Sequence, residues 1–160
     1  MDGKAERLLT VVACVAVGFV LYTTALGQAD QGKGPRQREF TERDALHCLQ
    51  ELGDALESHD EGKFLKAFDG GQMPGYPVFR DQVDAAFSQY ESFLVSYQLQ
   101  QVAMQGSYGV LLADFTVDAR PAGGTLPDVR KQAQLRLVLE WNNKAWKIVD
   151  LSPRTFFGAP

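Results

Sequence analysis

Residues 129–153 constrain the fold most, because their polarity alternates along two arms that meet at a short polar turn. In the first arm, 129–141, every second residue falls on a mostly apolar face and the residues between them are mostly polar, the period of two expected of a half-buried strand. The pair Asn142-Asn143 fits the turn, since asparagine tolerates the left-handed backbone that tight hairpins need. The second arm, 146–151, alternates in the same way. This segment therefore predicts a β-hairpin.

The N-terminal region contains 20 consecutive uncharged residues, 8–27, which are mostly apolar and follow two basic residues. A run of this kind is typical of a secretory signal peptide, with cleavage here after Gly27 or Ala29. It is also long enough for one membrane-spanning helix, at about 1.5 Å of rise per residue. The sequence predicts an N-terminal hydrophobic helix within residues 1–29, and it leaves a signal peptide and a single membrane anchor both open.

Either alternative places the folded domain in the cell envelope, as a secreted or periplasmic protein or as an anchored one that faces outward. Residues 30–39 are rich in glycine, glutamine and charge and have no periodicity, so they are predicted to be a flexible tether. Residues 1–29 contain two basic and two acidic residues, which leaves 14 Lys and Arg against 18 Asp and Glu in the rest. This mildly acidic balance, without a basic patch, argues against nucleic acid as a partner.

The two cysteines predict no disulfide within the domain, because Cys14 lies in the N-terminal apolar run and Cys48 in a predicted helix. Their spacing fits no metal site, so no metal and no cofactor are predicted. A phosphate-binding loop is not predicted either, because the pair Gly123-Gly124 precedes no helix.

Three helices are predicted in the first half of the domain. Thr41 is suited to cap the first, which carries apolar residues at helical spacing and ends near Ser58. Asp60 is suited to cap a second helix over 61–68. The third is predicted over 78–93, where six apolar residues, four of them aromatic, share one face. Such a face needs a large, flat partner, and a sheet is the obvious one.

Two further strands are predicted between the third helix and the hairpin. The first runs over 95–104 and changes phase near Gln100-Gln101, which indicates a β-bulge. The second runs over 110–118. The predicted fold is therefore α+β, with three N-terminal helices packed on a curved four-stranded antiparallel sheet in a domain over 40–153. Residues 154–160 are predicted to be a C-terminal tail.

The order of these elements, together with the strand Trp-Lys-Ile-Val-Asp at 146–150, resembles the nuclear transport factor 2-like superfamily. The resemblance covers about residues 40–153, with the helix over 61–68 as support, and it implies a cone in which the sheet wraps around the helices. The chain lacks a strand pair between its second and third helices, so it looks closer to the shorter exported members. Members of the ketosteroid isomerase and polyketide cyclase types carry out acid-base chemistry inside this cone, and the resemblance implies that activity as one option.

Acid-base chemistry would need an ionisable group on the concave face of the sheet. The inward strand positions are mostly apolar, with Asp150 as the main exception, since it shares its phase with Trp146 and Ile148. Tyr97 falls near it if the first strand faces the same way. Asp150 and Tyr97 are therefore candidate binding residues at a pocket mouth, although a carboxylate at a strand end is also suited to bond a neighbouring backbone group. Trp141 and Trp146 are candidates either for the core or for ligand stacking.

No catalytic residue is assigned from the sequence. His47 points away from the apolar stripe of its helix and His59 falls at a helix junction, so neither is suited to activate a nucleophile. The outward strand face mixes valines and leucines with charged and amide side chains, which is typical of a contact surface. We expect this face to form a homodimer or to bind a protein partner.

Three functions are compatible with this pattern. The first is an exported or membrane-tethered binding module, without enzymatic activity, for a protein partner or a small apolar ligand. The second is an isomerase or cyclase that uses Asp150 in a cone pocket. The third is an assembly component of a secretion apparatus, because some of those components resemble an anchored domain of this fold.

Overall fold

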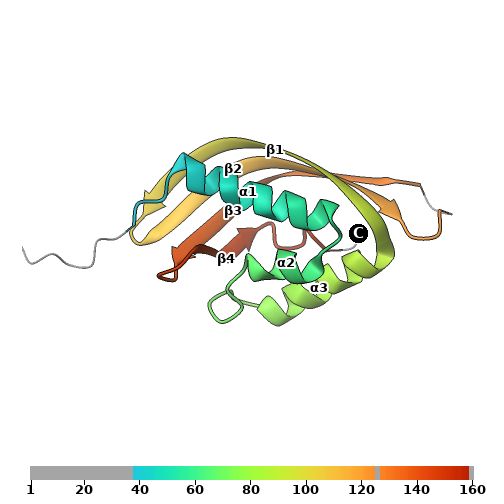
Figure 1. Ribbon diagram of the computed structural model, residues 1–160, viewed down its shortest axis with the longest axis horizontal. Helices are drawn as coiled ribbons and strands as arrows, with labels where there is room; N and C mark the ends of the chain where they lie inside the picture. The colour runs from blue at the N-terminus through green and yellow to red at the C-terminus, as the bar shows by residue number, and fades with distance from the viewer. Residues whose placement is uncertain (1–37, 125–126, 159–160) are drawn as a thin grey trace, which may run out of the picture. The chain divides into compact units, whose positions relative to one another are not determined.

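The computed structural model describes residues 38–124 and 127–158 (Figure 1). The predicted signal peptide or anchor in residues 1–29, and most of the predicted tether, lie outside these residues. Three helices precede four strands, as the sequence predicts: α1 (Glu42–Glu57), α2 (Glu61–Lys66), α3 (Tyr76–Gln89), β1 (Tyr90–Gln105), β2 (Tyr108–Pro121), β3 (Val129–Trp141) and β4 (Trp146–Ser152). None of the helices in the described part is long and apolar enough to cross a membrane.

The sheet is antiparallel throughout, in the order β1-β2-β3-β4, and it curves so that the helices lie on its concave side (Figure 1). The predicted β-bulge in β1 is present, because the pairing with β2 shifts register between Leu99 and Gln101. The turn between β3 and β4 is also as predicted, with Asn143 in the left-handed region at a φ of 71°. The α+β fold class is confirmed.

The free edge of β4 is covered by the segment that follows α2. Phe68 forms a parallel bridge with Ile148. Ile148 donates its N–H to the Ala67 carbonyl and accepts the N–H of Asp69, each at 2.9 Å. These bonds use the outward backbone groups of Ile148, which the edge strand would otherwise expose at that position.

The third helix is shorter than its apolar spacing predicts. α3 ends at Gln89, and both Tyr90 and Phe93 belong to β1. The pairing of β1 with β2 shifts register between Tyr90 and Ser92, so Glu91 is the extra residue of a β-bulge. This bulge lets two aromatic rings three residues apart point to the same side of the strand, and that spacing imitates a helix.

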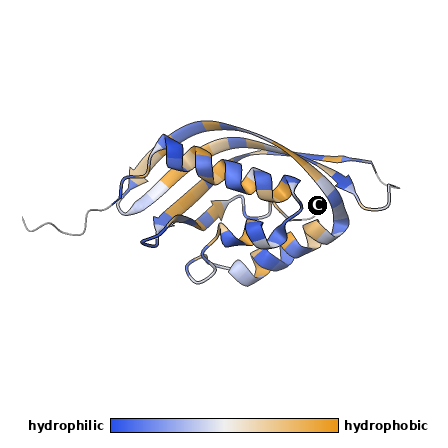
Figure 2. Ribbon diagram, in the orientation of Figure 1, coloured by the Kyte–Doolittle hydropathy of each residue, from blue (hydrophilic) through white to orange (hydrophobic). Residues whose placement is uncertain are grey.

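The core lies between the helices and the concave face of the sheet, and hydropathy alternates along the strands (Figure 2). The strands contribute inward side chains that are almost fully buried, namely Leu111, Ala113, Phe115, Leu135, Leu137, Leu139, Ile148 and Leu151. Phe156 and Phe157 also belong to the core. The packed domain therefore extends to Gly158, beyond the boundary at Pro153 that the sequence predicts.

Candidate functional site

The interior of the cone, between the concave sheet face and the helices, is filled by aromatic side chains. The ring of Phe115 on β2 meets that of Phe156 at 5.9 Å and that of Phe157 at 5.6 Å between centroids. Phe64 on α2 reaches Phe157 at 5.0 Å. The cavity that is left measures about 20 Å³, which is little more than the roughly 10–15 Å³ that one water molecule needs. In this conformation the cone has no room for a substrate.

Asp150 lies on the outer face of the sheet and not in the cone. The pairing of β3 with β4 shifts register, so that Asp150 faces Val138, an outward residue. Val149 is the extra residue of this β-bulge, and it reverses the phase that the alternation predicts for the end of the strand. The Asp150 carboxylate instead accepts a hydrogen bond from the guanidinium of Arg154 at 2.9 Å. The inward position that the sequence predicts for Asp150 is therefore corrected.

Tyr97 points inward from β1, where it faces Phe115 across the strand pair, and it lies apart from Asp150 on the other face. Its ring stacks on Phe115 with 6.0 Å between centroids and 15° between planes. The residue is 37% exposed. Burial raises the pKa of the Tyr97 hydroxyl, and the charges of Asp54 and Glu57 raise it further. The hydroxyl stays protonated at neutral pH, and it does not share a site with Asp150.

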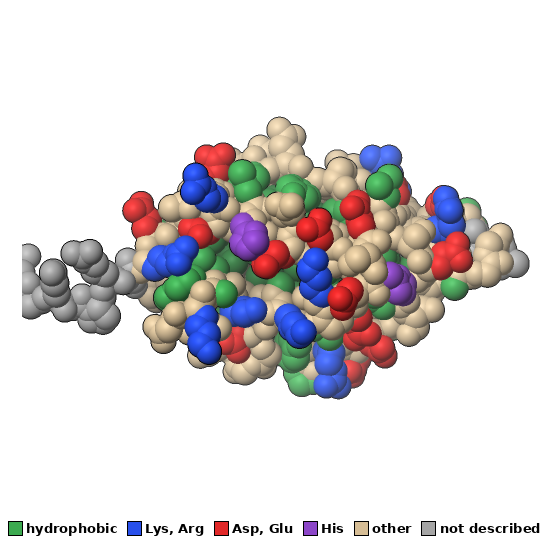
Figure 3. All heavy atoms as spheres, viewed as in Figure 1, with side chains coloured by type: hydrophobic (Ala, Val, Ile, Leu, Met, Phe, Trp, Pro, Cys, Tyr) green, Lys and Arg blue, Asp and Glu red, His purple; other side chains and the backbone are tan. Residues whose placement is uncertain are grey.

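Trp141 and Trp146 lie together at a groove between α1 and the β3–β4 hairpin. Their ring centroids are 5.7 Å apart, with 61° between the planes. The groove has a volume of about 270 Å³, and Figure 3 shows acidic and basic side chains around hydrophobic atoms on this face. We call it the tryptophan groove, and it is lined by Arg38, Asp44, His47, Cys48, Glu51, Trp141, Lys144, Ala145, Trp146 and Lys147.

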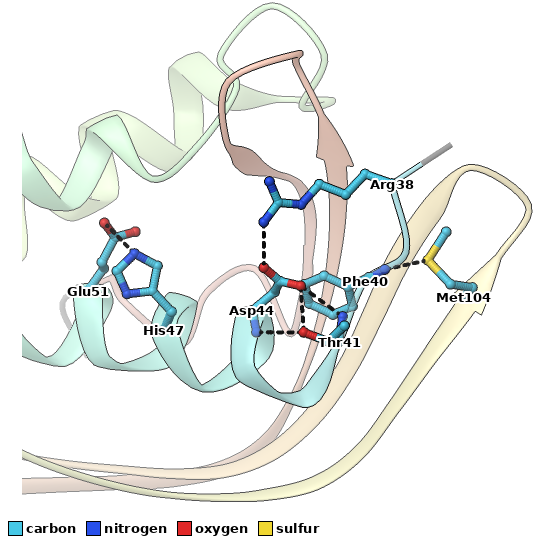
Figure 4. A network of polar contacts seen from close by, with 7 residues as sticks. All are labelled: Arg38, Phe40, Thr41, Asp44, His47, Glu51 and Met104. Carbon is cyan, nitrogen blue, oxygen red and sulfur yellow. Dashed lines mark hydrogen bonds and ion pairs between the residues drawn. The ribbon is translucent and has the colours of Figure 1, made fainter. Parts of the chain in front are cut away.

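Arg38 joins the two walls of the tryptophan groove. Its guanidinium lies 4.1 Å from the centre of the Trp141 ring, and it donates to Asp44 Oδ1 at 3.3 Å (Figure 4). A cation over an indole ring contributes about 0.5–1 kcal/mol at an exposed site. Phe40 packs its ring edge against Trp146, with 4.9 Å between centroids. The residues just before α1 therefore hold both tryptophans in place.

A capping box fixes the N-terminus of α1, as the sequence predicts for Thr41. The Thr41 N–H donates to Asp44 Oδ2 at 3.0 Å, and the Asp44 N–H donates to Thr41 Oγ1 at 3.3 Å (Figure 4). Burial alone would raise the pKa of the Asp44 carboxyl. The hydrogen bonds from Thr41 and the charge of Arg38 together outweigh burial and hold this pKa below its usual 3.8.

We expect Asp44→Asn to weaken the domain at neutral pH and to flatten its response to acid. The folded-state pKa of Asp44 lies below the unfolded one, so the ionised carboxylate stabilises the fold above the unfolded pKa, and this is lost as pH falls through the folded pKa. The Thr41 cap itself remains in this variant, and a negative charge in the first turn of a helix contributes about 0.3–1 kcal/mol. Urea unfolding at pH 7, pH 5 and about pH 2.5 measures the effect. Between the two lower pH values the wild-type protein should lose more stability than the variant, and equal losses would contradict the prediction.

The other ionisable groups of the tryptophan groove are poorly suited to covalent or metal chemistry. Burial, with a smaller effect from the Glu51 charge, raises the pKa of the Cys48 thiol to about 12, so little reactive thiolate forms at neutral pH. His47 is exposed and lies 3.4 Å from Glu51 (Figure 4). Among the described residues, no group of three or more His, Cys, Asp or Glu side chains is placed to hold a metal ion. What the groove offers is aromatic surface and paired charges for binding.

Sequence reasoning finds the two tryptophans of the groove but misses Arg38, which it assigns to the tether over 30–39. The partner of Arg38 is Trp141, far along the chain, so no local pattern points to the contact. It also gives no role to Lys131, an inward residue of β3. A charged residue that interrupts an otherwise apolar strand face is the signal that could have singled it out.

Neither a protein-family model nor a curated protein sequence matches this chain. Solved structures do match. A protein from Novosphingobium aromaticivorans, described provisionally as a scytalone dehydratase, is 8% identical with a TM-score of 0.59, over 68% of this chain and 79% of that one. A nuclear transport factor 2-like superfamily protein from Salmonella enterica is 10% identical with a TM-score of 0.58, over 68% and 86% of the two chains. The chain has the nuclear transport factor 2-like fold.

The fold that the sequence resemblance implies is therefore confirmed. A type 2 hexachlorocyclohexane dehydrochlorinase is a further match, 12% identical with a TM-score of 0.52, over 68% of this chain and 81% of that one. Structures with the nuclear transport factor 2-like fold thus include proteins named as enzymes. At these identities the similarity concerns the fold alone, so the activity of this chain has to be argued from its own residues.

Proposed function

We propose that this chain is an exported or membrane-tethered binding module without enzymatic activity, and that it binds a protein segment in the tryptophan groove. The observation that carries the proposal is the contrast between two spaces in one domain, since the cone interior holds about 20 Å³ and the groove about 270 Å³. An isomerase or cyclase that uses Asp150 has less support, because Asp150 is on the outer face. The fold alone remains compatible with an enzyme.

The charges of the tryptophan groove favour an acidic partner. The Asp44 carboxylate is paired with Arg38, and the Glu51 carboxylate lies 3.4 Å from the His47 imidazole. Lys144 and Lys147 have no carboxylate partner among the described residues, although Lys147 Nζ donates to the Lys66 carbonyl. The half-buried Trp141 adds an aromatic surface of the kind that anchors bound segments. A segment that presents a carboxylate beside an apolar or aromatic side chain fits both features.

Selection of peptides from a random library on the immobilised full chain tests this proposal. We expect the selected peptides to combine Asp or Glu with an aromatic residue, and to change the tryptophan fluorescence when they bind. Trp141→Ala should weaken a selected peptide at least about tenfold, roughly 1.4 kcal/mol, because it removes one of the two half-buried indole rings that line the groove. Lys144→Glu should weaken the same peptide through charge repulsion.

Tyr108→Ala is the matched control for Trp141→Ala. Tyr108 is an aromatic residue that is 41% exposed, on the outer face of the sheet. This variant should bind a selected peptide as the wild-type protein does. Peptides selected without acidic residues, or equal binding by Trp141→Ala and the wild-type protein, would place the partner surface elsewhere.

The envelope location rests on the uncharged run over residues 8–27. N-terminal sequencing of protein isolated from its cells distinguishes the two forms. A new N-terminus after Gly27 or Ala29 would indicate a cleaved signal peptide, and an intact N-terminus in the membrane fraction would indicate an anchor. An intact chain in the cytosol would contradict both forms. An assembly component of a secretion apparatus would be a special case of the membrane-tethered binding module. For this role the chain would have to associate stably with other membrane proteins.

We also propose that the outer sheet face pairs two copies of this chain. Leu94 and Tyr108 are on this face and are 66% and 41% exposed, which is a large exposure for apolar side chains. Val138 lies half-buried on the same face. Sedimentation of the full chain should show a dimer, and Val138→Glu should show a monomer. A wild-type monomer at every concentration would contradict this pairing.

A further inference from the structure

Residues 153–158, which we call the C-terminal segment, place two aromatic rings inside the cone. The side chains of Phe156 and Phe157 are each 7% exposed. Phe157 packs edge-on against Phe64 of α2 and Phe115 of β2. These rings occupy the space that the curved sheet and the helices enclose.

The C-terminal segment is held by side chains and not by helix or sheet pairing. Within the described residues its backbone-to-backbone hydrogen bonds are two turn contacts, from the Phe156 N–H to the Pro153 carbonyl at 3.3 Å and from the Gly158 N–H to the Thr155 carbonyl at 3.1 Å. Lys131 Nζ, from the inner face of β3, donates to the Phe156 carbonyl at 3.5 Å and also to the Gly158 carbonyl. A segment with so few backbone bonds can separate from the domain without breaking the sheet.

Lys131 is a half-buried cation in apolar surroundings. It lines the 20 Å³ cavity, and the other residues around that cavity carry no charge. No carboxylate pairs with it among the described residues. Burial lowers the pKa of the Lys131 ammonium group, which reflects the cost of a charge in apolar surroundings. Backbone carbonyl dipoles compensate this cost less fully than a carboxylate would.

Tyr90 supplies a second unsatisfied donor in the same cavity. Its side chain is 3% exposed, and its hydroxyl has no hydrogen-bond partner in the described structure. Buried hydroxyl groups are normally paired, so an unpaired one suggests an absent acceptor. Tyr90 and Lys131 both line the cavity, so a ligand there would meet two side-chain donors.

We propose that the C-terminal segment occupies a binding site for an aromatic carboxylate and that such a ligand displaces it. The ring of the ligand replaces the phenyl rings of Phe156 and Phe157 against the core. Its carboxylate replaces the two backbone carbonyls on Lys131 and accepts from Tyr90. This site is separate from the tryptophan groove and does not depend on the function proposed for that groove.

A disulfide that locks the C-terminal segment tests the displacement directly. A Cβ atom at Gly158 would lie 3.3 Å from the Cβ atom of Gln82 on α3, close to the roughly 3.5–4.5 Å of a disulfide. The variant Gln82→Cys/Gly158→Cys, made in the full chain with Cys14→Ser, closes the site when oxidised and frees it when reduced. Cys48 is buried, with a pKa of about 12, so it is a poor competitor for thiol exchange.

The probe is 2-naphthoate, a flat aromatic carboxylate, and 2-naphthamide is its uncharged counterpart. Calorimetry should show that the reduced double-cysteine variant binds 2-naphthoate with the affinity of the wild-type chain. The oxidised form should bind it at least about tenfold more weakly. Phe157→Ala should bind it at least about tenfold more tightly than the wild-type chain, because the open form is more populated without that ring. Near-UV circular dichroism checks folding. If Phe157→Ala does not fold, the affinities of the oxidised and reduced double-cysteine variant still test whether the C-terminal segment must move for the ligand to bind.

Lys131→Met tests the role of the cation. The wild-type chain should bind 2-naphthoate more tightly than 2-naphthamide, and the Lys131→Met variant should bind the two compounds equally. The matched control is Lys63→Met, which removes an exposed lysine of α2 and should leave the preference unchanged. Equal binding by the oxidised and reduced forms would overturn the proposal. So would a reduced form that binds neither compound, or an unchanged preference in Lys131→Met.

Discussion

Replacing Phe64 by alanine is expected to lower the free energy of unfolding by about 3–5 kcal/mol. Phe64 is fully buried, and its ring lies 5.4 Å from that of Phe68, 6.0 Å from that of Phe87 and 5.0 Å from that of Phe157. These neighbours come from three different parts of the chain, so filling the space that the ring leaves would require several elements to shift together. Because domains are stable by only about 5–15 kcal/mol, the loss is a large fraction of the total. Urea unfolding followed by tryptophan fluorescence measures it.

Two further variants separate the cavity from other effects of the substitution. Phe64→Leu keeps most of the apolar volume and should cost clearly less than Phe64→Ala. Val78→Ala removes a side chain on α3 that is 64% exposed, and it should change the free energy of unfolding by no more than about 0.5 kcal/mol. A loss below about 1 kcal/mol in Phe64→Ala would show that α2 is not packed into the core.

Local sequence rules predict the elements whose causes lie within a few residues. The cap of α1 depends on Thr41 and Asp44, three positions apart, so a short window of sequence contains the whole interaction. The β3–β4 hairpin is also predicted from a short window of sequence, because its turn residues lie between its two strands. Once its turn is placed, Trp141 has to face Trp146, and half of the tryptophan groove follows. The other wall comes from α1 and Arg38, whose contact with the hairpin no local pattern predicts.

Two β-bulges explain two wrong predictions, the end of the third helix and the direction of Asp150. A bulge adds one residue to a strand and so reverses the alternation beyond it. At Glu91 the extra residue puts two aromatic side chains, three positions apart, on one face of the strand. That spacing predicts a helix as far as residue 93, whereas α3 ends at Gln89. At Val149 the extra residue turns Asp150 outward, and the predicted pocket residue becomes a surface residue. Both bulges are set by cross-strand pairing, which is a long-range property.

The C-terminal segment is a third case of the same kind. Phe156 and Phe157 follow Pro153 and form a pair too short to show any period, so the sequence predicts a tail. Their burial depends on a space between α3 and the sheet that exists only after the whole domain has folded. The feature that most limits chemistry in the cone is therefore one that periodicity cannot predict.

Gly109→Ala is expected to cost about 1–3 kcal/mol of stability through overpacking and to weaken peptide binding in the tryptophan groove. A Cβ atom at Gly109 would lie 2.8 Å from the Cβ atom of Phe40 and closer still to its Cγ atom. These atoms are at the base of the side chain, so a rotamer change alone does not relieve the clash. The Phe40 backbone is also held, because its N–H donates to the sulfur of Met104 at 3.3 Å (Figure 4). Phe40 has to move as a whole, and the ring of Trp146 that packs against it has to move as well.

Gly53→Ala is the matched control, since it makes the same substitution where there is room. A Cβ atom at Gly53 would lie 3.6 Å from the side chains of Val95 and Tyr97, an ordinary contact. Within α1, alanine is favoured over glycine by about 0.5–1 kcal/mol, so this variant should be more stable or unchanged and should bind peptide normally. Urea unfolding and tryptophan fluorescence compare the two variants. The same sign of effect in both would mean that the close approach of Phe40 to Gly109 does not hold the tryptophan groove in its shape.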